Sequence, residues 1–499
     1  MELWILLACA VLFLITIHVL YVVVLGHKRR EAPLPPGPAG LPIIGNALTF
    51  FGLLSHNPHR ALARLAQTYG PIFSFRPGTT CTFVVLSSPA LAREALAEKD
   101  SALAARFVPD SVRARSYGVG SVAFMPSSNP LWKQHRATVA AHLISGRGLS
   151  ATRPIRDRHA RRLAEHLRSC SGRPVHVGEA VFSAANNAIS NILFSADVVD
   201  LRMQGGTPFK DVVGELFREW AKPNVSDAFP FLARLGLLGS RRRTSRNLGQ
   251  LFKLFDEFVG RRLAGGEHHG DMLDDVLELY ARSQLTRSEI TTLFTDMFIG
   301  ASETSNITVE WAMAHLLRHP DKMKKLQAEI ATSIGSKEFI EESDLDKLPY
   351  LHAVVKETLR LHPAVPVVTR EAAAEGVSLG GFPVPIGTCI LVNLWAIGRD
   401  PTVWSEPEEF MPERFLCTDR ELHFRGSDFA YRPFGGGRRM CPGLDFAARF
   451  VPLVLASIVH KIDWRLPERM VLQDIDLSER CTLVLALATP LIAVPTSTA

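Results

Sequence analysis

Hydrophobic residues recur three and four positions apart over most of this chain, which is the spacing of one helix face. The pattern predicts helices over Trp132–Ser145, Ile155–Arg168, Gly206–Ala221, Gln250–Leu263 and Leu293–Leu317. The last of these is apolar on most sides, so we expect it to run through the core. Short apolar runs bounded by turn residues predict strands at Ile72–Phe75 and Thr82–Leu86, and another short strand with turns is expected within Gly381–Ile390. The expected fold is mainly α with a small β-rich subdomain.

The N-terminal segment has a different pattern, because Leu3–Leu25 is almost uninterrupted apolar sequence. About 20 apolar residues span a bilayer core. The basic run His27–Arg30 follows directly, and such flanks stay on the cytosolic side. A cleaved signal peptide would place its basic residues first and end in a small-residue cleavage site, so it fits less well. We expect a single-pass anchor over residues 1–27, a basic and proline-rich hinge over 28–45, and a catalytic domain over 46–499 facing the cytosol.

Charge and cysteine usage narrow the classes of partner. The net charge of +6 fits an acidic partner or an anionic membrane surface. Binding of nucleic acid is not expected, because no basic motif interleaved with aromatic residues is present. The seven cysteines are scattered and form no CxxC pair, which argues against zinc sites and redox dithiols. An odd, dispersed set indicates a reducing compartment.

One cysteine is set apart by its neighbours. Cys441 lies in the segment Phe434–Gly443, where four glycines let the backbone approach a ligand closely. Arg438 and Arg439 precede it and could neutralise anionic charge. Such a loop could present a thiolate to a large, flat, anionic cofactor such as haem. Because a thiolate on haem iron favours cleavage of an O–O bond, the segment predicts an oxygen-activating enzyme.

The long apolar helix contains a short polar cluster at Gly300–Ser305. Its small residues leave room for a flat ligand, and the carboxyl of Glu303 and the hydroxyl of Thr304 could relay protons to bound oxygen. The structural alternative is that these hydroxyls bond to the helix backbone and bend the helix. The residues alone do not decide between the two.

Two further pairs carry candidate chemistry. Glu357 and Arg360 lie three apart on one helix face, and Arg414 downstream offers a second guanidinium for the same carboxylate. Trp132 and Arg136 lie four apart, and both side chains can donate to a carboxylate. Taken alone, each pair is typical of an ordinary helix.

In chain order, these segments resemble the cytochrome P450 superfamily, the haem-thiolate monooxygenases, over nearly the whole chain. The resemblance implies a cytochrome P450 fold plus one N-terminal transmembrane helix. It implies haem b as cofactor and O2-dependent hydroxylation of an apolar small molecule. Electrons would come from NADPH through a membrane-bound flavin reductase, whose acidic surface could meet Lys133.

The resemblance also assigns roles to individual residues. Cofactor-binding roles fall on Trp132, Arg136, Ala301, Arg370, Phe434, Arg439, Cys441 and Gly443. Among these, Cys441 is the expected metal ligand, and Arg439 is expected to meet a haem propionate. Glu303 and Thr304 are the expected catalytic pair. A buried structural triad is expected from Glu357, Arg360 and Arg414.

Two departures from the family pattern concern the cofactor and the substrate pocket. Ala301 stands where the family usually has glycine, so the groove on the oxygen side is expected to be tighter. The segment Pro366–Arg370 is one residue shorter than in many relatives and lacks a proline before the arginine. The candidate pocket is assembled from Val108–Phe124, Phe217–Ala221, Thr295–Thr304, Val365–Thr369 and Thr482–Ala486.

The subfamily can be narrowed by three segments. Trp395–Pro401 resembles plant microsomal enzymes, which implies the endoplasmic reticulum membrane. Lys222–Pro230 and Thr308–Met313 resemble the geraniol-hydroxylase-like branch, which oxidises terpenoids, including labdane-related diterpenes and monoterpenols. The expected substrate is a terpenoid. Alternatives are a haem-thiolate isomerase or dehydratase, a monooxygenase acting on a non-terpenoid specialised metabolite, and a non-catalytic haem- or lipid-binding protein.

Overall fold

The computed structural model describes residues 12–13, 15–16, 33–42, 44–53, 57–78, 81–199, 208–236, 239–416 and 422–497. Among these residues, no helix combines the length and apolar character needed to cross a bilayer. The anchor predicted for Leu3–Leu25 falls almost wholly outside the described residues and stays a prediction.

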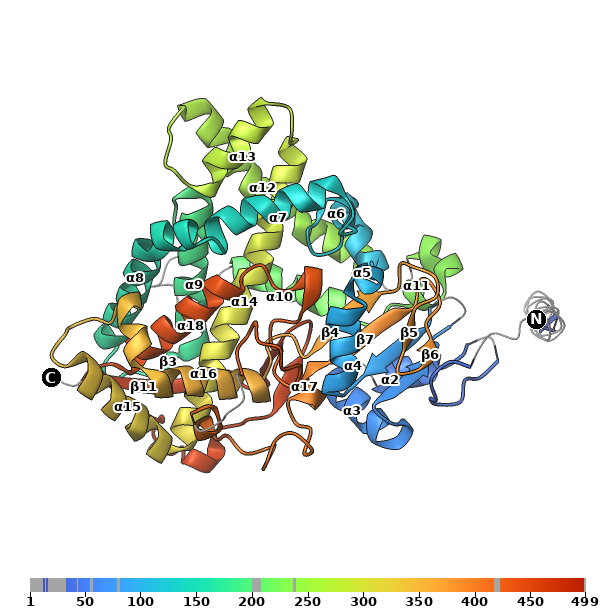
Figure 1. Ribbon diagram of the computed structural model, residues 1–499. Coiled ribbons are helices and arrows are strands. Elements are labelled where there is room, and N and C mark those ends of the chain that lie inside the picture. The colour runs from blue at the N-terminus through green and yellow to red at the C-terminus, as the bar shows by residue number, and fades with distance from the viewer. Residues whose placement is uncertain are drawn as a thin grey trace, which may run out of the picture.

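Helices dominate the described chain, as expected from the sequence (Figure 1). The longer ones are α3 (Pro58–Tyr69), α7 (Pro130–Leu143), α8 (Gly146–Ser169), α9 (Val177–Phe194), α10 (Pro208–Ala221), α12 (Ser240–Gly265), α13 (Met272–Ala281), α14 (Arg287–Arg318), α15 (Pro320–Ile334), α16 (Pro349–Leu361) and α18 (Leu444–Val459). The short ones are α2 (Ala47–Leu53), α4 (Pro89–Arg93), α5 (Asp100–Leu103), α6 (Tyr117–Gly120), α11 (Val225–Ala228) and α17 (Leu394–Ile397). A π-helical turn is η1 (Glu94–Glu98), and 3-10 turns are η2 (Asp110–Ser116), η3 (Pro230–Leu235), η4 (Glu342–Lys347), η5 (Pro412–Phe415), η6 (Gly437–Arg439) and η7 (Leu472–Asp474).

Within the described residues, the strands form four small sheets. They are β1 (Ile72–Phe75), β2 (Phe83–Leu86), β3 (Val175–His176), β4 (Val367–Glu371), β5 (Ser378–Leu379), β6 (Phe382–Pro383), β7 (Cys389–Asn393), β8 (Ile462–Arg465), β9 (Glu479–Cys481), β10 (Leu485–Leu487) and β11 (Ile492–Ser497). The largest sheet has the order β1-β2-β7-β4, with β2 and β7 parallel and the other pairs antiparallel. Strand β7 therefore lies beside β2 although about 300 residues separate them in the chain (Figure 1).

Both faces of this sheet are covered. Val84 and Leu86 of β2 face one apolar cluster, and Phe83 and Val85 face another. The alternation follows from the two-residue period of a strand. Because both faces are buried, the strand reads as a continuous apolar run.

The segment Gly381–Ile390 contains strand and turns, as the sequence predicts, but the strand is divided in two. The structure has β6 and β7 there, separated by a turn in which the Thr388 N–H donates to the Pro385 carbonyl at 3.1 Å. Gly387 has φ of +79°, a left-handed conformation that breaks an extended run. The apolar composition predicted β structure correctly but could not place the turn.

Helices α8 and α12 begin well before the predicted starts. The helix predicted over Ile155–Arg168 starts directly after Pro154, and proline inside a helix removes a backbone donor. The helix passes through Pro154 nonetheless. Fully buried Arg156 holds this turn, since it donates to the Leu149 carbonyl and to Glu342 across the helix packing.

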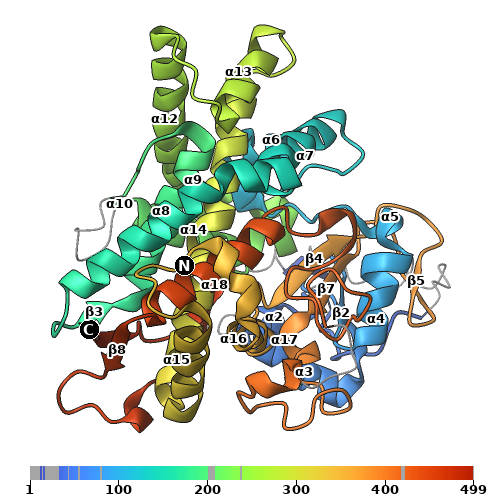
Figure 2. The same ribbon diagram turned by 60° about the vertical axis from the view of Figure 1, so that its left-hand side comes forward.

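Helix α14 is the central element, as its apolar pattern predicts. Helices α9, α12, α16 and α18 pack around it, and nearly every position beyond its first turn is buried (Figure 2). Its start is fixed by a capping box, in which Thr286 and Glu289 each accept the other's backbone N–H. Figure 2 shows α8, α9, α14 and α18 on one side of the molecule and the strands β2, β4 and β7 on the other.

The proline-rich segment is packed against the body rather than projecting from it. Ser74 of β1 donates its N–H to the Pro36 carbonyl at 2.8 Å and its hydroxyl to the Pro35 carbonyl at 2.7 Å. Gly37 sits so close to the strand that an added Cβ would lie 1.8 Å from the Ser74 carbonyl oxygen. The end of the predicted hinge is thereby fixed to the sheet.

Candidate active site

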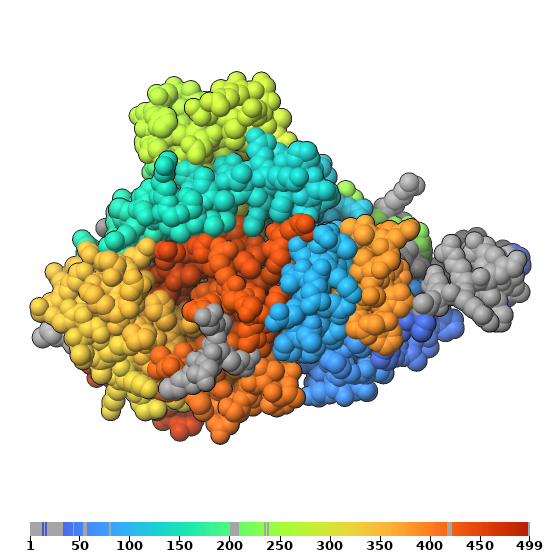
Figure 3. Space-filling model, in the orientation of Figure 1, coloured from blue at the N-terminus to red at the C-terminus, as the bar shows by residue number. Residues whose placement is uncertain are grey.

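Cys441 lies between the turn η6 and the start of α18. Its N–H donates to the Phe434 carbonyl at 3.1 Å, which closes the loop. Gly435 and Gly437 have φ of +72° and +64°, so the loop needs glycine at both positions. The segment lies on the face between α7 and the α4–α5 segment, in orange-red in Figure 3.

The surroundings of the Cys441 thiol shift its pKa in both directions. Burial raises the pKa of Cys441, while a hydrogen bond from the backbone of Gly443 and the charge of Arg136 lower it. An iron ion would supply the missing positive charge and stabilise the thiolate. Cys441 is therefore suited to be a metal ligand.

Asp100 on α5 holds the cysteine loop in place, a role that was not predicted from the sequence. Its carboxylate accepts the Arg438 N–H at 3.1 Å and the Arg438 guanidinium at 3.2 Å. A Cβ on Gly437 would lie 2.0 Å from an Asp100 oxygen. Nothing in the local pattern marks Asp100, because its partners lie 338 residues further along the chain.

Arg439 and Trp132 meet at one backbone carbonyl. The Trp132 indole N–H and the Arg439 guanidinium both donate to the Val122 carbonyl at 3.0 Å. Arg439 also donates to the carbonyls of Ala104 and Met125, and its guanidinium lies 5.0 Å from the Trp132 ring centre. Two of the residues expected to hold the propionates are therefore brought together.

Arg136 and Arg370 both reach the cysteine loop. Arg136 donates to the Met440 carbonyl at 3.2 Å, one residue before Cys441. Arg370, on β4, is fully buried and donates to the Gly436 carbonyl at 2.9 Å. The shortened segment before Arg370 still places its guanidinium on the cysteine side of the sheet.

A fourth guanidinium, that of Arg106, joins this group and was missed from the sequence. Arg106 donates to the Thr369 hydroxyl at 3.1 Å. Its Nε atom and that of Arg370 are buried without a hydrogen-bond partner among the described residues. Arg106 is the one charged residue in the apolar run before Pro109, and arginine is rarely buried unpaired. That contrast could have marked Arg106 as a candidate site residue.

The carboxylate of Asp100 only partly balances these buried cations, since it is already paired with Arg438. Burial lowers the pKa of Arg106 to about 10, and burial together with the charge of Arg106 lowers the pKa of Arg439 to about 10. Burial and the charges of Arg106 and Arg439 also lower the pKa of Arg370. Buried charges of one sign require an anion. The two propionates of haem supply such charge, so these residues fit that cofactor.

We expect Arg106→Gln to weaken haem retention by about 10- to 100-fold, since a hydrogen bond to a charged group contributes about 1.5–3 kcal/mol. The measurement is transfer of haem to an apo-globin acceptor, followed by absorbance. Lys133→Gln is the control, because Lys133 is exposed on α7 and makes no contact with this group. Equal transfer rates for the Arg106 variant and the wild type would contradict the assignment.

The acid–alcohol pair lies in the middle of α14. The Thr304 hydroxyl donates to the Gly300 carbonyl at 2.9 Å, the local bond that the structural alternative requires. The Thr304 hydroxyl oxygen can still accept a hydrogen bond from another donor. Burial raises the pKa of Glu303, although Lys210, Arg480 and Arg218 lower it. A carboxyl with a raised pKa is suited to deliver protons near neutral pH.

Two neighbours of the pair shape the helix wall. Ser302 is fully buried and donates to Asn186 on α9 at 2.9 Å, so its hydroxyl is turned away from the acid–alcohol pair. Ala301 is half-buried and packs against the main core. Its methyl group occupies space that glycine would leave open.

Glu357, Arg360 and Arg414 form one buried ion network. Arg360 donates to both Glu357 oxygens at 2.7 and 2.8 Å, and Arg414 donates to one of them at 3.0 Å. The remaining Arg360 donors bind the carbonyls of Gly398 and Pro407 at 2.7 Å and that of Glu409 at 3.0 Å. Every charge therefore has a partner, the condition under which a buried ion network is tolerated.

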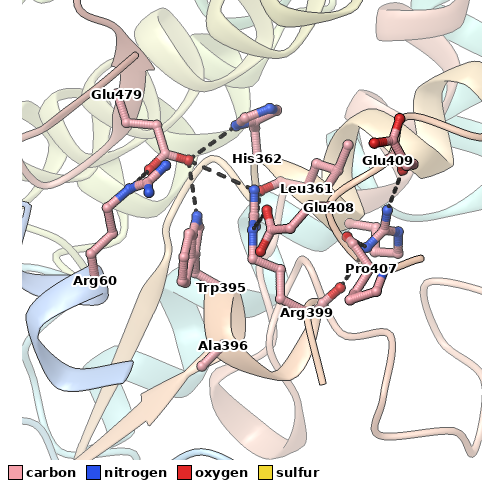
Figure 4. Close-up of polar contacts among 12 residues, drawn as sticks. Arg60, Leu361, His362, Trp395, Ala396, Arg399, Pro407, Glu408, Glu409 and Glu479 are labelled. Carbon is pink, nitrogen blue, oxygen red and sulfur yellow. Dashed lines mark hydrogen bonds and ion pairs between the residues drawn. The ribbon is translucent and has the colours of Figure 1, made fainter. Parts of the chain in front are cut away.

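A second buried network, centred on Glu479, was not predicted. Its carboxylate accepts from Trp395 at 2.9 Å and from Arg60 at 2.5 Å, and His362 lies 3.3 Å away (Figure 4). Burial alone would raise the pKa of Glu479, but hydrogen bonds from His362 and His59 lower it strongly. The network ties β9 to α3 and to the end of α16.

The candidate pocket segments divide into two kinds. Val484 and Leu485 are buried in the core, and the Leu485 carbonyl accepts the Trp311 N–H at 2.9 Å. Leu483 is partly exposed, and Val365 packs at the edge of the core. Leu483 and Val365 therefore keep the part-exposed position that a pocket wall requires, as do Val367 and Val368.

Comparison with known proteins gives relatives along nearly the whole chain. The family model described as Cytochrome P450 matches residues 35–492. Oryzalexin E synthase of Oryza sativa subsp. japonica is 42% identical over 95% of this chain and 95% of its own length. Geraniol 8-hydroxylase of Catharanthus roseus is 40% identical over 94% of this chain and 95% of its own. Carnosic acid synthase of Rosmarinus officinalis is 40% identical over 94% of both.

Proposed function

Because the chain belongs to the cytochrome P450 family and is a haem-thiolate monooxygenase, we propose that it hydroxylates a terpenoid. The observation that carries the substrate class is the similarity to terpenoid-oxidising enzymes over nearly the full length of both chains. Labdane-related diterpenes and monoterpenols are the two candidate groups. An apolar skeleton suits the half-buried aliphatic wall at Val365 and Leu483.

The chain's own residues have separable tasks in this reaction. Haem, when bound, supplies the activation of O2 with electrons from a reductase. Cys441 would ligate its iron. The propionates would be held by Trp132, Arg106, Arg136, Arg370 and Arg439.

Proton delivery is the proposed task of Glu303 and Thr304. Burial keeps a larger fraction of Glu303 protonated near neutral pH than an exposed carboxyl would be. Thr304 is the next residue on α14, and its hydroxyl can accept a proton from one side and donate from the other. Glu303 would give its proton to the Thr304 hydroxyl, and Thr304 would donate a proton toward O2.

We expect Thr304→Ala to uncouple electron use from product formation. Consumption of NADPH should continue, while product per NADPH falls by about 10- to 100-fold, within the usual contribution of a positioned proton donor. The measurement is product and hydrogen peroxide per NADPH. Thr308→Ala is the control, because Thr308 lies one turn further along and donates to the Thr304 carbonyl. Unchanged coupling in Thr304→Ala would remove the relay role.

We further propose that the protein is a single-pass protein of the endoplasmic reticulum membrane, with its catalytic part in the cytosol. A membrane-bound NADPH flavin reductase would dock at the cysteine side. Lys133 is exposed there, whereas Arg439 is buried and therefore unavailable. The support is the apolar segment Leu3–Leu25 with its basic flank.

The deciding experiment is incubation of microsomes carrying the full chain and a plant reductase with a terpenoid panel. We expect products heavier by one oxygen atom, formed only with NADPH and labelled by 18O2. Product formed without NADPH would support an isomerase or dehydratase. Turnover restricted to non-terpenoid metabolites would overturn the proposed substrate class.

A further inference from the structure

Four aromatic rings gather where the η2–α7 segment meets α10 and α12, and we call them the α10 aromatic cluster: Tyr117, Phe124, Trp220 and Phe252. Tyr117 and Trp220 stack with ring centres 5.4 Å apart and planes 18° from parallel. Phe124 stands edge-on to Trp220 at 6.1 Å. The cluster joins two of the segments that the sequence assigns to the substrate pocket.

One atom of this cluster, the indole nitrogen of Trp220, is a buried hydrogen-bond donor. The Trp220 N–H has no hydrogen-bond partner among the described residues, and the residue is only 9 % exposed. Every other tryptophan of the described chain donates its N–H to a protein oxygen, namely Trp132, Trp311, Trp395, Trp404 and Trp464. A buried donor left unpaired costs about 1–3 kcal/mol. Such a donor inside an aromatic cluster points to a ligand that supplies an acceptor.

The position of Trp220 is fixed through Tyr117. The Tyr117 hydroxyl donates to Asp296 of α14 at 2.5 Å, and the same carboxylate accepts from Ser121 at 2.7 Å and from the Val122 N–H at 2.6 Å. The carboxylate is thus occupied by donors of the η2–α7 segment. Tyr117 cannot turn without breaking this contact, so the face it offers to Trp220 is rigid.

The same contacts relate the cluster to the reacting centre. Val122 accepts from Arg439 and Trp132 through its carbonyl while its N–H binds Asp296. Asp296 precedes Thr304 by eight residues on α14, which is about 12 Å along the helix axis. A ligand atom at Trp220 would therefore lie well away from the carbon that is attacked.

We propose that the Trp220 N–H binds an oxygen atom already present on the substrate, so that the enzyme takes an alcohol or ketone of a terpenoid rather than the parent hydrocarbon. The inference rests on the proposed function and adds a specificity-determining residue to it. Oxidation would then occur at the end of the molecule remote from the first oxygen.

The test compares pairs of probes that differ by one hydroxyl, in spin-state titrations of the holoenzyme. The pairs are ferruginol with abietatriene, and geraniol with 2,6-dimethylocta-2,6-diene. Wild-type enzyme should bind the oxygenated member about 3- to 10-fold more tightly, the value of one hydrogen bond. Trp220→Phe should lose this preference and leave hydrocarbon binding unchanged, and Trp220→His, which keeps an N–H, should retain part of it.

Trp464→Phe is the control, because its N–H donates to the Ile458 carbonyl at 2.7 Å, remote in the fold from the cluster. A preference in Trp220→Phe equal to that of the wild type would mean that the N–H meets only water, and would overturn the inference alone. A wild-type enzyme with no preference would also overturn it, without any variant. The absence of any spin-state shift with terpenoids would overturn the proposed function with it.

Discussion

Replacing Cys441 by alanine should abolish the strongly red-shifted Soret band of the reduced CO complex. The band reports a thiolate on haem iron, and Cys441 is the cysteine whose loop is closed toward the arginine group. We expect hydroxylation to fall by more than about 100-fold, because the loss of an outer-shell partner alone costs 10- to 100-fold at metal sites.

The matched control is Cys481→Ala. Cys481 is also half-buried, but it lies on β9, and burial raises the pKa of its thiol to about 12. This variant should keep the band and most of the activity. A red-shifted band that persists in Cys441→Ala would show that the ligand is another residue.

The second large effect is expected at Glu357, which touches neither substrate nor cofactor in the proposed arrangement. Glu357→Gln keeps the shape of the side chain but removes the charge between Arg360 and Arg414. Breaking a buried ion network costs about 3–5 kcal/mol, a large part of the 5–15 kcal/mol that typically separates folded from unfolded protein. We expect little haem-loaded protein and early thermal unfolding, measured by CO difference spectra and circular dichroism.

Glu278→Gln is the matched control for this charge removal. Glu278 pairs with Arg282 at 3.5 Å, but their side chains are 71% and 63% exposed, and exposed pairs contribute at most about 1 kcal/mol. Wild-type haem content and stability in Glu357→Gln would exclude a supporting role for the triad.

Features of the site encoded locally could be predicted from the sequence. Trp132 and Arg136 share a helix face because their spacing is four, and the glycines before Cys441 mark a tight loop wherever they occur. Helix α14 was predicted within a few residues at its C-terminal end, since its apolar pattern is long and unbroken. Local periodicity and special backbone conformations can therefore be predicted from the sequence, because they depend on neighbouring residues.

The missed residues share a different property, which is dependence on partners far away in the chain. Asp100 binds a loop 338 residues distant, and Glu479 binds Arg60 from 419 residues away. Arg106 gains its meaning only from Arg370 and Arg439, which other elements bring beside it. No periodic signal encodes such meetings, and Trp395 and Arg399 were noticed only as a subfamily signature.

The contact between Asp100 and the cysteine loop limits how this enzyme could be recombined. The Asp100 carboxylate fills the space beside Gly437 and accepts the Arg438 N–H. A chimaera that took Phe434–Gly443 from one parent and α5 from another would combine the two sides of this contact, which we call the joint, from different proteins. The exchangeable module is therefore discontinuous, and a crossover between residues 100 and 437 keeps the joint only when both parents carry an acid and a glycine there.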